Sequence, residues 1–162
     1  SLRLLYCKNC MSADSYNSSL HTIQSPFYLM LRNDNPRSLD YGSLLWFGVP
    51  SFDYRDRQLP ASPTVSWDIG TATYIYQTPP RAIWGDILFT DHQWHTAQVD
   101  VLTMIQQAII DLNKQNLFKN TTVKDLEITH LNFGWESPGT FNAAIQIRTI
   151  SLKYVSAIPS EK

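Results

Sequence analysis

The chain has 162 residues, and its 13 Lys and Arg against 14 Asp and Glu give a formal net charge of -1. This length fits one domain, since domains commonly contain roughly 100 to 150 residues. The balanced charge, without a basic block, argues against nucleic acid as a partner. Charged residues make up 17% and aromatic residues 12%. Such a composition suits an uncharged, hydroxylated partner, or a subunit that buries much of its surface in an assembly.

No membrane insertion is expected. The longest apolar runs, residues 43–50 and 105–110, are far shorter than the roughly 18 to 20 residues of a membrane helix. Residues 1–5 lack the features of a signal peptide, which indicates a processed chain or a piece of a larger multidomain protein. We expect a single domain over residues 1–162, with residues 1–25 as a loosely attached N-terminal segment.

Short runs rich in β-branched and aromatic residues predict a series of β-strands, separated by Pro-containing stretches. Each run is about as long as a typical strand. In chain order these predicted strands are residues 27–32, 43–49, 64–68, 72–76, 87–90 and 94–100.

One segment follows the spacing of a helix instead. Val101, Ile105, Ile109 and Leu112 would share one face, while polar residues occupy the other. Asp100 stands where a helix cap is expected. We therefore predict one helix near residues 101–112.

Two alternating segments close the chain, at residues 126–133 and 141–155. Alternation indicates that one face of each strand is buried. The apolar positions change parity within the second segment, which predicts a β-bulge near Arg148 and Thr149. The predicted buried residues on these adjacent strands are Leu131, Phe133, Ile145 and Ile147.

Many short strands with one late helix favour an all-β fold. An antiparallel β-sandwich of the jelly-roll type fits this order better than alternating strands and helices do. Trp46 lies in an apolar run and is the tryptophan most expected in the core.

The two cysteines, Cys7 and Cys10, form a Cys-x-x-Cys element that looks like half a zinc knuckle. No second ligand pair is spaced with them, so we expect a disulfide or free thiols rather than a metal site. We predict no cofactor, apart from the option of a structural calcium ion.

Acidic residues beside large rings are the best candidate binding residues. Asp68 follows Trp67, and Glu136 follows Trp135; such a neighbour raises a carboxyl pKa or helps to clamp a sugar. Trp84 precedes Gly85 and Asp86 in what reads as an exposed loop entering a strand. A ring with neighbouring acids and amides suits the apolar faces and hydroxyls of sugars. The predicted ligand-binding residues are Trp84, Asp86, Trp135, Glu136, Trp67 and Asp68.

Residues 94–155 resemble the C-terminal half of galactose-binding-like jelly-roll domains, which include many carbohydrate-binding modules of polysaccharide-degrading enzymes. Residues 94–100 look like their Trp-His strand, residues 131–140 are similar to their Gly-containing loop, and residues 141–154 would be the closing strand. The predicted helix is longer than such modules usually carry at this point. The resemblance implies a jelly-roll fold and a secreted or cell-surface location.

The leading hypothesis is a non-catalytic module that binds a glycan or polysaccharide by aromatic stacking. The first alternative is a structural or assembly protein of a surface or capsid. The second is a small β-sandwich enzyme that acts on polysaccharide, with a site built from Asp68 and Glu136. No nucleophile elbow, phosphate loop or dinucleotide fingerprint occurs in the sequence, so no catalytic residue is predicted.

Overall fold

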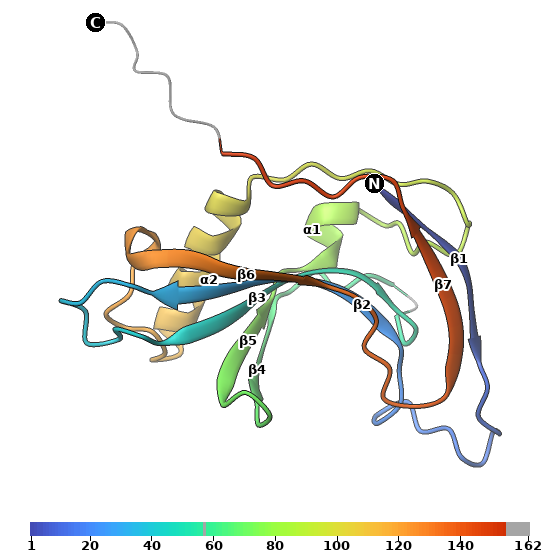
Figure 1. Cartoon of the computed structure of the whole chain (residues 1–162). Coiled ribbons are helices and arrows are strands. Elements are labelled where there is room, and N and C mark those ends of the chain that lie inside the picture. Colours follow the sequence, from blue (N-terminus) through green and yellow to red (C-terminus); the bar gives the residue numbers. More distant parts are fainter. Residues whose placement is uncertain (57, 155–162) are drawn as a thin grey trace, which may run out of the picture.

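The structure, a computed structural model, describes residues 1–56 and 58–154. It is mostly β, with one five-stranded and one two-stranded sheet and few helices (Figure 1). The predicted all-β class is therefore confirmed. The elements are β1 (Leu2–Asn9), β2 (Gln24–Asn33), β3 (Leu44–Asp53), β4 (Thr64–Asp68), β5 (Thr73–Gln77), α1 (Pro80–Trp84), α2 (Val101–Lys114), the 3-10 helix η1 (Val123–Asp125), β6 (Leu126–Phe133) and β7 (Phe141–Ile147).

The large sheet has the order β4-β5-β3-β2-β6, and the small sheet pairs β1 with β7. All of these pairs are antiparallel except β3 and β5, which are parallel. The chain leaves β3, forms the β4–β5 hairpin, and returns so that β5 runs beside β3 in the same direction. The expectation of a wholly antiparallel fold is wrong at this pair.

The predicted helix is confirmed and continues to Lys114. The Asp100 carboxylate accepts hydrogen bonds from the backbone N–H of Leu102 at 3.0 Å and of Thr103 at 3.3 Å. These bonds satisfy donors that have no partner within the helix. The sequence signal for the start of α2 was therefore a real cap.

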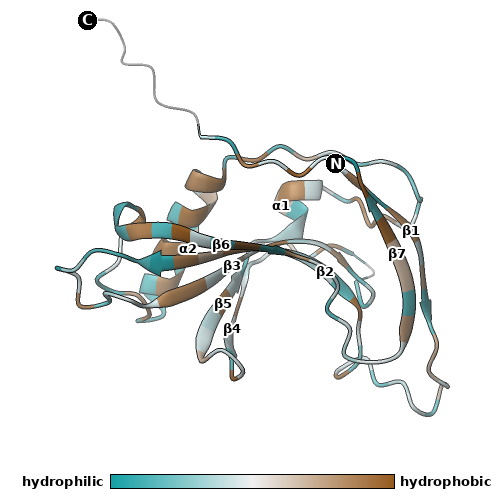
Figure 2. Cartoon of the chain, viewed as in Figure 1, coloured by the Kyte–Doolittle hydropathy of each residue, from teal (hydrophilic) through white to brown (hydrophobic). Residues whose placement is uncertain are grey.

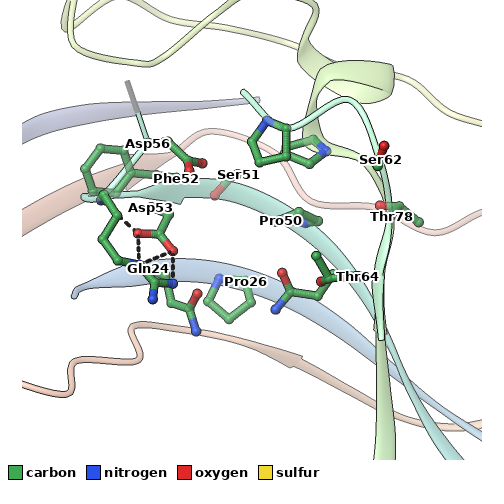
Figure 3. Close-up of a pocket in the computed structure, with 14 residues that line it drawn as sticks. Gln24, Pro26, Pro50, Ser51, Phe52, Asp53, Asp56, Ser62, Thr64 and Thr78 are labelled. Atoms are coloured by element: carbon green, nitrogen blue, oxygen red, sulfur yellow. Dashed lines mark hydrogen bonds and ion pairs between the residues drawn. The ribbon is translucent and has the colours of Figure 1, made fainter. Parts of the chain in front are cut away.

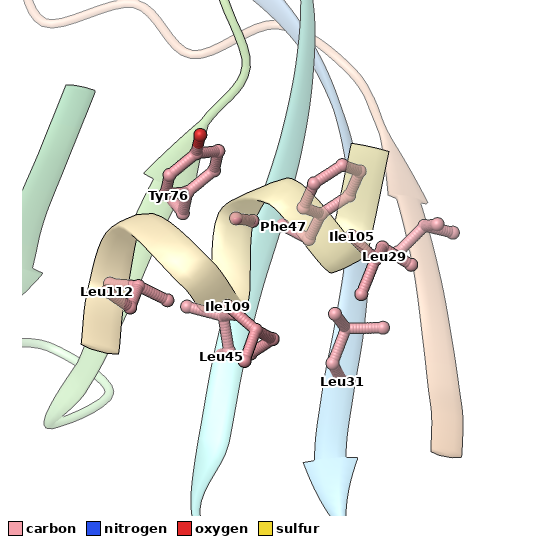
Figure 4. Packing of buried hydrophobic residues seen from close by; sticks show 9 residues of the cluster. Leu29, Leu31, Leu45, Phe47, Tyr76, Ile105, Ile109 and Leu112 are labelled. Carbon is pink, nitrogen blue, oxygen red and sulfur yellow. The ribbon is translucent and has the colours of Figure 1, made fainter. Parts of the chain in front are cut away.

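The main core lies between α2 and the large sheet. Figure 4 shows α2 lying across β5, β3 and β2, with their side chains turned toward it, and Figure 2 shows the apolar and polar residues that alternate along the helix. Apolar burial of this kind contributes about 1.5 to 3 kcal/mol for each large side chain. The buried cluster contains Leu29, Leu31, Leu45, Phe47, Tyr76, Ile105, Ala108, Ile109 and Leu112.

A second core joins the small sheet to α1 and to the far ends of β2 and β3. Its buried residues are Leu2, Leu4, Ile23, Phe52, Leu59, Trp84 and Phe89. β1 was not predicted as a strand, yet it pairs with β7 along its length. Leu2 and Leu4 are buried, so this part of residues 1–25 is packed into the protein.

Two predicted strands, residues 87–90 and 94–100, are wrong. Phe89 and His92 have positive φ values of 63° and 58°, which interrupt an extended chain because L-residues rarely adopt such angles in strands. The second segment makes only an isolated bridge, between His95 and Leu2.

The predicted closing strand is shorter than expected. β7 ends at Ile147, and residues 148–154 are not in a strand, so the β-bulge predicted at Arg148 and Thr149 is wrong. The change of parity marks the end of the strand instead. Val155, the last residue of that predicted strand, lies outside the described residues.

The core predicted from the last two strands is also wrong. β6 and β7 belong to different sheets, Leu131 and Ile147 are 50% and 43% exposed, and Phe133 and Ile145 are half-buried. Trp46, expected in the core, is half-buried as well; its Nε1 donates a hydrogen bond to Thr71 Oγ1 at 3.3 Å. The alternation of apolar and polar residues identified the two faces of each strand, but it did not show how completely the rest of the protein covers the apolar face.

Candidate functional site

Trp84 does not lie on an exposed loop, as the sequence predicted. It ends α1, which begins with Pro80 at a position where proline suits a helix. The side chain is buried at 9% exposure, packs edge-on against Phe89 at 5.0 Å between ring centroids, and donates a hydrogen bond from Nε1 to Pro50 O at 2.9 Å. Trp84 is therefore a core residue, and its ring is not available to a ligand in solution.

Asp86 is exposed beside this helix. Its Oδ1 lies 2.9 Å from Arg81 Nη2 in a surface ion pair. Exposed pairs of this kind contribute little to stability. With Trp84 buried, the predicted combination of a free ring and an acid is not present here.

Trp135 is half-buried and packs edge-on against Phe52, at 6.2 Å between ring centroids. The neighbouring Glu136 is exposed, and its Oε2 accepts a hydrogen bond from Gln24 Nε2 at 2.7 Å. The backbones of Gln24 and Glu136 also form an isolated bridge. Trp135 thus contributes mainly to the second core, while Glu136 extends the pairing at the edge of the sheet.

Trp67 is the one exposed residue among the five tryptophans, all of which lie in the described part of the chain. It is 52% exposed and packs edge-on against Tyr74 of β5, at 4.8 Å between ring centroids. Its neighbour Asp68 accepts hydrogen bonds from Thr71 Oγ1, Thr71 N–H and Gly70 N–H. These bonds lower the pKa of Asp68, so that residue stabilises the turn as a carboxylate.

Asp68 and Glu136 are not brought together. Asp68 ends β4 and Glu136 follows β6, which are the two edge strands of the large sheet. Three strands separate them, which corresponds to about 19 Å across the sheet at ~4.8 Å per strand. Glycoside hydrolysis needs two carboxylates within about 5 to 9.5 Å.

A pocket of about 250 Å³ opens beside Trp67. We call it the Trp67 pocket. It combines three aromatic rings with a carboxylate and hydroxyl groups, and this mixture is typical of sites that hold small polar molecules. Its lining residues are Asp40, Ser43, Leu44, Trp67, Ala72, Thr73, Tyr74 and Phe118.

The parallel pairing of β3 with β5 builds this pocket. It places Leu45 next to Tyr74, and therefore sets the start of β3 beside the turn that joins β4 to β5. Phe118, in the chain after α2, packs edge-on against Tyr74 at 6.2 Å between ring centroids. Rings from three separate parts of the chain thus surround one opening.

Two residues that line the Trp67 pocket hold strained backbone conformations. Ala72 and Phe118 both have φ near +50°, in the left-handed region that L-residues with a Cβ rarely adopt. Each such residue costs on the order of 1 to 3 kcal/mol, and strain of this kind clusters at ligand sites.

Asp40 supplies the carboxylate of the pocket. Its Oδ2 accepts hydrogen bonds from the Asn120 N–H at 2.7 Å and from Thr121 Oγ1 at 3.0 Å. A carboxylate offers about four acceptor sites. Two bonds to one oxygen therefore fix Asp40 and leave capacity to accept a hydroxyl from a ligand.

A second pocket, of about 280 Å³, lies at the opposite end of β3 (Figure 3). Asp53 and Arg55 form a paired contact there, with Arg55 Nη2 2.6 Å from Asp53 Oδ2. Burial alone would raise the pKa of Asp53, but the hydrogen bonds from Arg55 and Thr22 outweigh it and lower that pKa. Burial, and then the charge of Asp53, raise the pKa of Asp56 to about 6.

This second pocket is a weaker candidate for sugar stacking. The aromatic residue that lines it is Phe52, which is buried at 8% exposure and belongs to the second core. Stacking requires an accessible ring face. We therefore take the Trp67 pocket as the candidate binding site.

Sequence reasoning found Trp67 but missed Asp40 and Phe118. Asp40 follows a Pro-containing stretch, and Phe118 follows the predicted helix. Neither position carries a motif, and only the fold brings them to Trp67. The six predicted ligand-binding residues are spread over three separate regions of the structure.

The described residues were also compared with the requirements of a metal site and of a membrane-spanning helix. Within residues 1–56 and 58–154, no three His, Cys, Asp or Glu side chains gather closely enough to hold a metal ion. The proposal of a structural calcium ion stays a prediction. Cys7 and Cys10 are free thiols. None of the described helices is long and apolar enough to span a membrane.

No known protein family, curated protein or solved structure matches this chain. The function is therefore inferred from the chemistry of the Trp67 pocket.

Proposed function

We propose that this protein is a non-catalytic module that binds a glycan in the Trp67 pocket. The observation that carries the proposal is the exposed Trp67 ring at the edge of a pocket of about 250 Å³ that also holds Tyr74, Phe118 and Asp40. A sugar presents apolar C–H faces to a ring and hydroxyls to acceptors. This pocket offers both kinds of partner side by side.

The pocket favours recognition of a small part of a glycan. Its volume lies just below the roughly 300 to 1,000 Å³ of small-molecule sites. One sugar unit would stack on Trp67 while Asp40 accepts a hydroxyl hydrogen bond. The remaining units of a chain would extend over the exposed surface next to Asp40, whose sequence neighbours Leu39 and Tyr41 are 89% and 58% exposed.

The proposal includes the finer fold and family assignment. The β-rich, two-sheet architecture supports a jelly-roll-like sandwich of the galactose-binding-like type, and the parallel β3–β5 pair is a departure from it. Such modules commonly belong to larger secreted or cell-surface proteins. We extend the proposal to that location and to a polysaccharide as partner.

The test compares two variants at neighbouring positions. Trp67→Ala removes the stacking ring, and Ile69→Ala, at an 88% exposed residue outside the pocket lining, controls for changes to the turn. The probes are a glycan array and insoluble cellulose, chitin and xylan. Stacking contributes about 1 to 1.5 kcal/mol by analogy with aromatic pairs, so Trp67→Ala should weaken binding roughly five- to tenfold.

Ile69→Ala should bind like the parent, and circular dichroism should show that both variants are folded. A parent that binds none of these glycans, or a Trp67→Ala variant with the affinity of the parent, would reject glycan binding at this pocket. Asp40→Asn, which keeps the shape but removes the charge, should weaken binding without abolishing it.

A further inference from the structure

β6 is an edge strand of the large sheet. In the part of the chain that the structure describes, it pairs with β2 and with no other strand. The outer edge of such a strand presents backbone N–H and C=O groups that another strand can pair with. Proteins usually protect an edge of this kind with charges, proline, a β-bulge or a covering segment.

β6 carries apolar side chains that α2 does not cover. Its register with β2 places Ile128 beside Leu31, Leu131 beside Leu29 and Phe133 beside Phe27, so these residues share the face of the sheet on which α2 packs. Ile128 and Leu131 are nevertheless 42% and 50% exposed. Figure 4 shows why: α2 extends from β5 to β2, and β6 lies beyond it.

The positions of the apolar residues along β6 are symmetrical about the centre of the strand. A register shift between Met30 and Leu31 separates Ile128 from His130 in the pairing with β2. The apolar residues therefore sit at Leu126 and Ile128 on one side of the shift and at Leu131 and Phe133 on the other. In a regular strand, residues an odd number of positions apart point to opposite faces, so Ile128 and Leu131 would not share a face. The shift puts these mirrored positions on the same face.

We propose that β6 pairs antiparallel with β6 of a second copy of this chain, about a two-fold axis between Thr129 and His130. Leu126 then lies opposite the partner's Phe133, and Ile128 lies opposite the partner's Leu131. Apolar pairs directly opposite each other stabilise a sheet.

The same register suits the other face of the sheet. Glu127 lies opposite the partner's Asn132, so no two like charges meet, and like charges directly opposite each other would be destabilising. This pairing uses all eight residues of β6, from Leu126 to Phe133. Self-complementarity is the reason to assign the edge to a second copy rather than to an unrelated strand.

The interface is small, because it joins one short strand from each copy. Contacts below about 1,200 Å² are typical of weak or transient association. We therefore expect reversible dimers with a dissociation constant on the order of 10 µM. The two copies would form one continuous ten-stranded sheet, with β4 at both outer edges.

Sedimentation velocity on the full chain tests the association, over roughly 1 to 500 µM, a range that brackets the expected constant. The parent should shift from monomer to dimer. Leu131→Lys places a charge at the centre of the apolar pairing and should raise the dissociation constant at least roughly tenfold. Ile110→Lys is the control, because Ile110 is 49% exposed but lies on α2; it should dimerise like the parent.

Disulfide trapping tests the register. Ile128→Cys and Leu131→Cys are made separately, each with Cys7→Ser and Cys10→Ser. Opposed residues in an antiparallel pair have Cβ atoms close enough for a disulfide. Oxidation should therefore trap a dimer in a mixture of the two variants, and much less in either variant alone.

A parent that stays monomeric throughout the concentration range would overturn the proposal. A dimer that survives Leu131→Lys, or that gives no preferential disulfide in the mixture, would place the contact elsewhere and overturn it as well. Circular dichroism of each variant excludes unfolding as the cause of a loss of dimer.

Discussion

Replacing Leu112 with alanine tests the core beneath α2. Leu112 is fully buried in the cluster that includes Leu45 and Tyr76. The change removes three carbon atoms, or about 2.4 kcal/mol of transfer free energy at ~0.8 kcal/mol for each. A residual cavity adds to this loss, and the better helix propensity of alanine returns only about 0.2 kcal/mol. We expect the free energy of unfolding to fall by about 3 to 4 kcal/mol.

The matched control is Ile110→Ala on the same helix. Ile110 is 49% exposed, so only about half of its apolar surface is buried on folding and stabilises the protein. Removal of this side chain leaves no closed cavity. We expect a cost below about 1 kcal/mol. Urea unfolding followed by circular dichroism measures both values, and the slope m should stay that of the parent. Equal costs at the two positions, or a cost at Leu112 below about 1 kcal/mol, would show that α2 does not pack on the sheet as described.

Two further predictions concern β3 and the turn that follows it. A Cβ at Gly48 would lie 2.8 Å from Tyr28 Cε1, whereas one at Gly134 would meet nothing within 4 Å; Gly48→Ala should therefore lower the free energy of unfolding by about 1 to 3 kcal/mol and Gly134→Ala far less, in the same urea assay. Asp56 has a pKa raised to about 6 in the folded chain, so it holds its proton longer when folded. The stabilisation of the folded state by protonated Asp56 is complete below about pH 4 and is lost as the pH rises through 6. We expect this rise in pH to lower the free energy of unfolding by about 1 kcal/mol, after allowance for solvent screening. Asp56→Asn should remove this loss. If the free energy of unfolding of the variant depended on pH between 4 and 7 as that of the parent does, the raised pKa would be contradicted.

The sequence predicted the elements whose signals are local. Six strands, β2 to β7, and α2 follow from spacing over a few residues, and Asp100 is a cap because of the N–H groups that follow it directly. β1 was missed although Leu2 and Leu4 are apolar, because its only strand partner in the described chain is β7, at the other end of the sequence. The parallel β3–β5 pair likewise depends on a crossover that no local pattern encodes.

The candidate site was predictable only in part, for the same reason. Trp67 stood out as an aromatic residue beside an acid, but the partners that make it a site, Asp40 and Phe118, come from distant positions. Trp84 shows the opposite error. Its neighbours resemble a loop, yet Pro80 begins a helix, and the burial of the Trp84 ring depends on Phe89 and Pro50.

The pairing of β1 with β7 has a consequence for how the chain folds. Their partner residues lie about 130 to 145 positions apart in the sequence, so the small sheet closes a very long loop, and closing it costs more entropy than closing a hairpin does. At a synthesis rate of roughly 5 to 20 residues per second, β1 waits on the order of ten seconds for its partner to be made. The β2–β3 hairpin and α2 can form during this interval, so the second core, which contains Leu2 and Leu4, is completed last.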